Sequence, residues 1–133
     1  MPAWLDNTAS TGALDALLNV VKTNATNILL ITSYTQGDDY STVTGNAVAD
    51  ASITSGDFTG PSPSGFDRIL TFNGASATAS QGAVGPDLHM AITNGSNTVL
   101  AVSDESTDQD IVSGNTVNFG TFEIRALQPI SQA

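Results

Sequence analysis

The stretch LHMAITNGSNTVLAV, residues 88–102, decides the fold class of this chain. Its first half alternates, which places Leu88, Met90 and Ile92 on one face of a strand. Asn94-Gly95 then separates this run from a second apolar run. An Asn-Gly pair between two apolar runs is the strongest short signal for a β-hairpin. The stretch therefore predicts two adjacent antiparallel strands.

Other short runs extend this pattern over most of the chain. Residues 27–34 contain four successive apolar residues, 28–31, and predict a central strand buried on both faces. Residues 41–48 are weakly patterned and predict a strand or an extended loop. Residues 60–65 contain two prolines, which exclude a central strand, so we expect a loop there. Further strands are expected at residues 68–73, 75–81, 116–119 and 122–127.

An amphipathic helix is expected before these strands, over residues 12–23. Leu14, Leu17, Leu18 and Val21 recur at the spacing of one helical face. We expect all four side chains to be buried against a sheet, which contributes roughly 1.5–3 kcal/mol each. One helix followed by about seven short strands predicts a mainly β protein. Its expected architecture is an antiparallel β-sandwich or barrel, jelly-roll-like, because no crossover helices for a parallel sheet are visible.

The chain is expected to form one domain with a short arm. Residues 1–10 predict an irregular N-terminal arm, and residues 11–133 a single β-rich domain. Trp4 and Leu5 are the only large apolar groups of the arm, and they are our interface candidates. The alternative is that Trp4 folds back and covers the core of its own domain.

The charge balance limits the partners that the protein can bind. Thirteen acidic residues stand against three basic ones, which gives a formal net charge of −10. Such a surface repels phosphate and is not attracted to anionic lipid, so we expect neither nucleic-acid nor membrane binding. The sequence has no apolar run of membrane-spanning length, and its first residues do not resemble a secretory signal. We therefore expect synthesis in a cytoplasm.

Few side chains are suited to catalysis or cofactor binding. The chain has no Cys and one His, His89, which alternation places opposite the apolar row of its strand. No nucleophile elbow, phosphate-binding loop or dinucleotide fingerprint is present. We therefore predict a protein that is not an enzyme and needs no cofactor.

One acidic segment is a weak candidate for a calcium site. Asp104, Glu105, Asp108 and Asp110 could supply the oxygen ligands that calcium prefers. Their spacing does not match an EF-hand, and we favour a solvated acidic loop as the explanation for these residues.

The order of these elements resembles a group of small structural proteins of tailed bacteriophages. The resemblance covers most of the chain, in the order helix, apolar strand, loop rich in Gly, Pro and Ser, and paired strands. It implies a virion component, typically bound to the capsid, with no enzymatic activity. The segments that carry it are residues 13–19, 28–30, 67–72, 88–92, 98–102, 113–119 and 122–124.

The resemblance leads to a specific hypothesis about function. It implies a capsid decoration, or cement, protein that binds the major capsid protein on the outer surface of the virion and stabilises the shell. We expect it to act as a homotrimer made in the host cytoplasm, because closed symmetric oligomers suit the local symmetry of a shell. The alternatives are a virion protein of the tail, collar or fibre, and a β-sandwich module that binds a receptor or a glycan.

Overall fold

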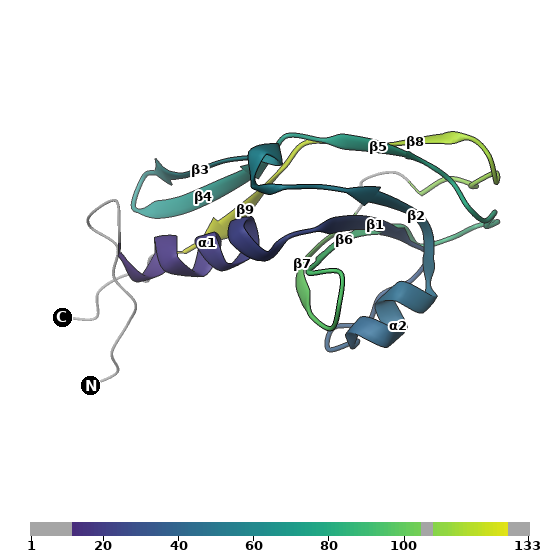
Figure 1. Cartoon of the computed structure of the whole chain (residues 1–133), viewed down its shortest axis with the longest axis horizontal. Coiled ribbons are helices and arrows are strands. Elements are labelled where there is room, and N and C mark those ends of the chain that lie inside the picture. Colours follow the sequence, from purple (N-terminus) through teal and green to yellow (C-terminus); the bar gives the residue numbers. More distant parts are fainter. Residues whose placement is uncertain (1–11, 105–107, 128–133) are drawn as a thin grey trace.

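The computed structural model describes residues 12–104 and 108–127. The protein is mainly β, with antiparallel sheets of four, three and two strands and a short N-terminal helix (Figure 1). The predicted arm, residues 1–10, lies outside the described residues. The elements are α1 (Ala13–Asn24), β1 (Asn27–Ile31), α2 (Tyr40–Gly45), β2 (Ala47–Ser52), η1 (Ser55–Asp57), β3 (Phe58–Ser64), β4 (Asp67–Phe72), β5 (Ala75–Thr78), β6 (His89–Thr93), β7 (Val99–Asp104), β8 (Thr116–Phe119) and β9 (Phe122–Ala126).

The four-stranded sheet has the order β2-β1-β6-β7. The predicted central strand is confirmed, because β1 pairs with β2 on one side and with β6 on the other. It is buried on both faces: Ile28 and Leu30 join the main core, whereas Leu29 and Ile31 join a smaller cluster on the outer face. Continuous apolar residues are the expected pattern for a strand covered on both sides.

The predicted hairpin of residues 88–102 is also confirmed, as β6 and β7. Asn94 organises the connection, because its Oδ1 accepts hydrogen bonds from the backbone N–H groups of residues 96, 97 and 98 at 2.9–3.0 Å. Gly95 has a φ of +75°, and a Cβ there would lie 2.5 Å from Oγ1 of Thr26. Only glycine fits this position without displacing the neighbouring segment.

The two smaller sheets form one long layer. The three-stranded sheet has the order β3-β4-β9, and the two-stranded sheet pairs β5 with β8. The chain passes from β4 to β5 and returns from β8 to β9, so the two sheets follow each other along one ribbon (Figure 1). Gly74 lies at the interruption with a φ of +96°, where a Cβ would lie 3.0 Å from the carbonyl oxygen of Phe119.

This long layer covers both α1 and the four-stranded sheet. At one end α1 packs against β3, β4 and β9, and at the other β5 packs against β2. Leu70 and Phe72 of β4 are fully buried in the core that lies between the layers. Among the described residues the strands form no closed barrel, so of the two expected architectures the barrel is excluded.

The helix prediction was right in position and wrong for one side chain. α1 spans Ala13–Asn24, and Leu14, Leu18 and Val21 are buried. Leu17, which we expected to be buried with them, is 52% exposed. The apolar stripe of α1 is wider than the surface that the sheet offers, so its margin remains in solvent.

Two local predictions were wrong. Residues 41–48 do not form a strand or an extended loop at their start, since Tyr40–Gly45 is the helix α2. Residues 60–65 are not a loop, because Phe58–Ser64 forms β3. The exclusion of a central strand was correct, since β3 is an edge strand whose register shifts between Thr59 and Ser62. Proline is tolerated at such an edge or bulge because no ladder hydrogen bond is required of it.

No helix in the described ranges is long and apolar enough to cross a membrane.

Candidate functional site

Two residues of the predicted acidic segment, Asp108 and Asp110, make hydrogen bonds to the backbone of the residues that precede β6. Oδ1 of Asp108 accepts a hydrogen bond from the backbone N–H of Leu88 at 2.8 Å. Oδ1 of Asp110 accepts one from Gly85 N–H at the same distance. These contacts attach the segment to the approach to β6. Glu105 lies outside the described residues, and the calcium site stays a prediction.

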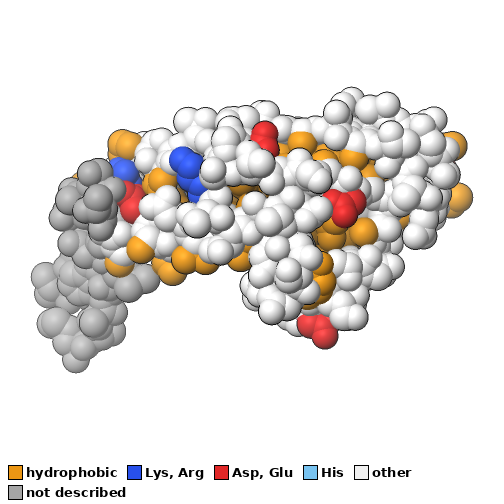
Figure 2. All heavy atoms as spheres, viewed as in Figure 1, with side chains coloured by type: hydrophobic (Ala, Val, Ile, Leu, Met, Phe, Trp, Pro, Cys, Tyr) orange, Lys and Arg blue, Asp and Glu red, His pale blue; other side chains and the backbone are white. Residues whose placement is uncertain are grey.

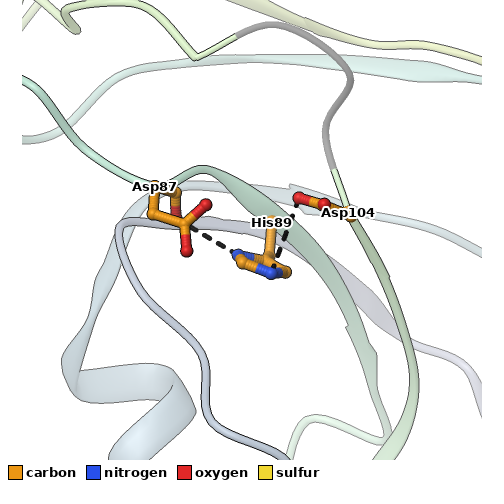
Figure 3. A group of neighbouring side chains, drawn as sticks. All are labelled: Asp87, His89 and Asp104. Atoms are coloured by element: carbon orange, nitrogen blue, oxygen red, sulfur yellow. Dashed lines mark hydrogen bonds and ion pairs between the residues drawn. The ribbon is translucent and has the colours of Figure 1, made fainter.

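Asp104 lies instead beside His89 and Asp87 (Figure 3). His89 begins β6 and Asp104 ends β7, and the register places the two residues directly opposite each other. Nε2 of His89 lies 3.6 Å from Oδ1 of Asp104, and Nδ1 lies 3.2 Å from the backbone carbonyl oxygen of Asp87. One ligand atom of each side chain lies within 4.8 Å of the other two. Three side chains able to bind a metal ion therefore meet at one corner of the sheet.

His89 itself is held in place by its surroundings. Its side chain is 14% exposed, and its ring centroid lies 5.8 Å from that of Tyr34. Both rings line an open hollow of about 550 Å³ beside β7, together with Asp38 and Asp104. Leu88, Met90 and Ile92 belong to the main core, so the predicted placement of His89 on the opposite face is confirmed.

Sequence reasoning missed Asp87 and the meeting of Asp104 with His89. A signal for Asp87 exists, because it precedes His89 by two residues and alternation favours the same face. Asp104 could not be assigned to His89 beforehand, since the register between β6 and β7 shifts between Ile92 and Thr93. A shift of one position would have turned Asp104 to the other face.

All three basic side chains make contacts within the protein. Arg68 donates to Asp15 from Nε at 2.7 Å and from Nη2 at 3.2 Å. Lys22 donates from Nζ to the carbonyl oxygen of Gly60 at 2.7 Å. Arg125 lies 3.3 Å from Asp67 and 3.4 Å from Glu123. The positive charges are thus engaged with α1, β3, β4 and β9.

Exposed apolar side chains occur at the two ends of the molecule. Leu17 and Val20 lie on the outer side of α1, and we call them the helix patch. Val84 and Val112 follow the paired residues Ala83 and Ile111, and we call them the loop patch. α1 and the connections beyond β5 and β8 lie at opposite ends in Figure 1, and Figure 2 shows apolar side chains at both margins.

The helix patch has exposed apolar neighbours at its end of the fold. Phe66 lies in the turn between β3 and β4, and Leu127 directly follows β9. They are 86% and 62% exposed. Trp4 and Leu5, the predicted interface residues, lie outside the described residues.

The chain matches no protein-family model, no curated protein and no solved structure. Its function has to be inferred from its own surfaces and side-chain clusters.

Proposed function

We propose that this protein is a non-enzymatic structural component of a phage virion that decorates the outer surface of the capsid. The observation that supports this proposal most directly is the pair of exposed apolar patches at opposite ends of the fold. A protein that clamps neighbouring capsid subunits needs two separate contact surfaces. The helix patch and the loop patch supply them.

The energetics of these patches suit attachment to other protein. Burying a Leu or Val side chain is worth roughly 1.5–3 kcal/mol, and four such side chains form the two patches. Interface cores are depleted in charge, and only 12% of this chain is charged. The three basic side chains already contact acidic groups or a backbone carbonyl, which leaves little positive surface for a polyanion.

Decoration would stabilise the shell by mass action. A ligand that binds only the assembled shell stabilises each site by RT ln(1 + [L]/Kd), about 2.7 kcal/mol when its concentration is a hundred times Kd. Homotrimers of the protein would multiply this effect, because linked contacts to the major capsid protein act together. The acidic residues exposed on the surface outside the patches would remain in solvent.

The test is cosedimentation of the purified protein with shells of the major capsid protein from the same phage. We expect saturation at hundreds of copies per shell and a higher temperature of shell disruption. The paired variants Leu17→Ser/Val20→Ser and Val84→Ser/Val112→Ser should each weaken attachment. Thr78→Ser, an exposed change on β5, is the matched control and should bind as the parent does.

Three outcomes would contradict the proposal. Attachment unchanged in both paired variants would remove the patches from the contact. Saturation at a handful of copies per particle would favour a role in the tail, collar or fibre. Binding to glycans, with no binding to shells, would favour a receptor- or glycan-binding module. Light scattering of the free protein tests the trimer directly, because its mass would be three times that of one chain.

A further inference from the structure

We propose that Asp87, His89 and Asp104 bind a divalent transition-metal ion of the zinc type, with His89 as the nitrogen ligand through Nε2. This site is separate from the two apolar patches and does not depend on the proposed function.

The strand geometry brings the three ligands to one side of the sheet. Asp87 lies two residues before His89, the first residue of β6, and the two side chains offer ligand atoms within 4.8 Å of each other. Asp104 is the cross-strand partner of His89, and facing side chains in an antiparallel pair have Cβ atoms about 4.5–5.5 Å apart. A ligand from the neighbouring strand thus completes a set of three without any loop having to fold over the site.

The hydrogen bond at Nδ1 determines whether Nε2 carries a hydrogen or a lone pair. A carbonyl oxygen can only accept, so the contact between Nδ1 and the carbonyl of Asp87 requires the hydrogen on Nδ1. In a neutral imidazole, Nε2 then carries a lone pair, and this lone pair faces the carboxylate of Asp104. Two electron-rich atoms repel each other unless a cation or a second proton lies between them. Metal-binding histidines use the same arrangement, donating their other N–H to a backbone carbonyl or a carboxylate.

The separation of the two facing atoms favours the metal ion over a direct hydrogen bond. A charge-assisted hydrogen bond from an imidazolium to a carboxylate is about 2.7–2.9 Å long. The observed distance from Nε2 to Oδ1 is 3.6 Å. Two ligands at about 2.0–2.1 Å from one tetrahedral zinc ion lie roughly 3.4 Å apart. The pair of Nε2 and Oδ1 therefore needs to contract by only a few tenths of an ångström around an ion, and the Asp87 carboxylate, whose ligand atom lies within 4.8 Å, moves in to complete the set.

The mixture of ligands selects the class of metal. Imidazole suits zinc, copper and nickel, whereas calcium and magnesium prefer sites made of oxygen atoms. His89 is largely buried against Tyr34, whereas Asp87 and Asp104 are exposed. The nitrogen ligand is thus held rigidly, and the carboxylates can close over an ion that arrives from solvent. With three protein ligands, water would take the fourth position.

The experiment uses the fact that His89 is the only histidine of the chain. Long-range ¹H–¹⁵N NMR of its ring identifies the tautomer without assignment of other signals. We expect the metal-free protein at pH 8 to carry the hydrogen on Nδ1. Added zinc chloride should shift the Nε2 resonance and saturate at one ion per chain. Calcium chloride at the same concentration should leave the ring unchanged.

Calorimetric titration with zinc then tests the carboxylates. Asp87→Asn and Asp104→Asn should each weaken binding by about tenfold or more, in the range seen when groups of a metal site are removed. Glu123→Gln, which removes an exposed carboxylate from β9, should bind zinc as the parent does. The site is refuted if neutral His89 carries its hydrogen on Nε2, or if zinc leaves the ring signals of the parent protein unchanged. It is also refuted if the two Asn variants bind zinc as tightly as the parent.

Discussion

The two α-helices of the described residues are attached to the fold in opposite ways. α1 buries Leu14, Leu18 and Val21 and adds a buried ion pair to β4. α2 buries only Val43 against β1, and its start is fixed by the exposed carboxylate of Asp39. The first helix is therefore held mainly by tertiary packing and the second mainly by local hydrogen bonds. Only packing by a whole helical face leaves a periodic pattern in the sequence.

The strongest test of this contrast removes the buried ion pair of α1. Arg68→Met leaves the carboxylate of Asp15, which is 4% exposed, without its guanidinium. We expect a loss of up to about 3–5 kcal/mol in the free energy of unfolding, because the buried carboxylate keeps its desolvation cost and loses the cation that offsets it. Urea denaturation followed by circular dichroism measures it.

Two further variants complete this test. The double replacement Asp15→Leu/Arg68→Met should recover most of the loss, since no buried charge remains. Arg125→Met breaks the exposed contacts to Asp67 and Glu123 and should cost no more than about 1 kcal/mol. Equal losses for Arg68→Met and Arg125→Met would show that burial does not govern the strength of these pairs.

The next largest effect is a difference in stability loss between alanine variants of two adjacent leucines in α1. Leu18 is 3% exposed and Leu17 is 52% exposed. Leu18→Ala should lower the free energy of unfolding by about 2–5 kcal/mol, the range for a leucine removed from a core. Leu17→Ala should change it by no more than about 0.5 kcal/mol, as at an ordinary surface position. If both variants lost the same stability, the helix would be rotated relative to the sheet described above.

A smaller loss is expected in α2. Val43→Ala removes two methyl groups from a side chain that is 1% exposed, at about 0.8 kcal/mol each. Alanine favours a helix slightly more than valine does, so the net loss should be about 1 kcal/mol. Val20→Ala, at an exposed position of α1, is the control and should be neutral or slightly stabilising. A loss well above this value would mean that α2 carries more tertiary packing than its single buried side chain indicates.

The contrast between the helices also explains which elements of the fold could be predicted from the sequence and which could not. The β6–β7 hairpin was predictable because its strands are neighbours and its turn residues carry their own conformational signal. α2 was missed because six residues with one buried side chain cannot establish a period. Its one local signal was Asp39, a residue type that commonly precedes a helix.

The pattern of apolar and polar residues could not predict which strands pair over long sequence separations. β4 pairs with β9 and β5 with β8 across sequence separations from 38 residues (Thr78 and Thr116) to 58 (Arg68 and Ala126). Alternation gives the face of each strand, but it does not give the partner. The same limit applies to the cluster of Asp87, His89 and Asp104. The face of His89 followed from its neighbours, whereas its meeting with Asp104 required the register of a hairpin that contains a bulge.

The smallest effect that we expect is at the start of α2 and depends on pH. The pKa of Asp39 lies below its ordinary value of 3.8, because the backbone N–H of Thr42 donates to its carboxylate and the Thr42 hydroxyl adds to this effect. A folded-state pKa that is depressed stabilises the folded form fully above the unfolded value, and the contribution is lost as pH falls through the folded pKa. The cap should therefore weaken only below about pH 4, where Asp39 becomes protonated.

The amide of Thr42 measures this cap directly. Its ¹H chemical shift should titrate with the depressed pKa of Asp39, and its hydrogen exchange, compared at matched intrinsic rates, should lose protection in the same pH range. Asp39→Asn keeps an oxygen acceptor and removes the titration, so the shift should become independent of pH between 2 and 5. Asp50→Asn, on β2, should leave the titration of Thr42 intact. A pH-dependent Thr42 shift that persists in Asp39→Asn would mean that another carboxylate, and not the helix cap, responds to acid at this end of the sheet.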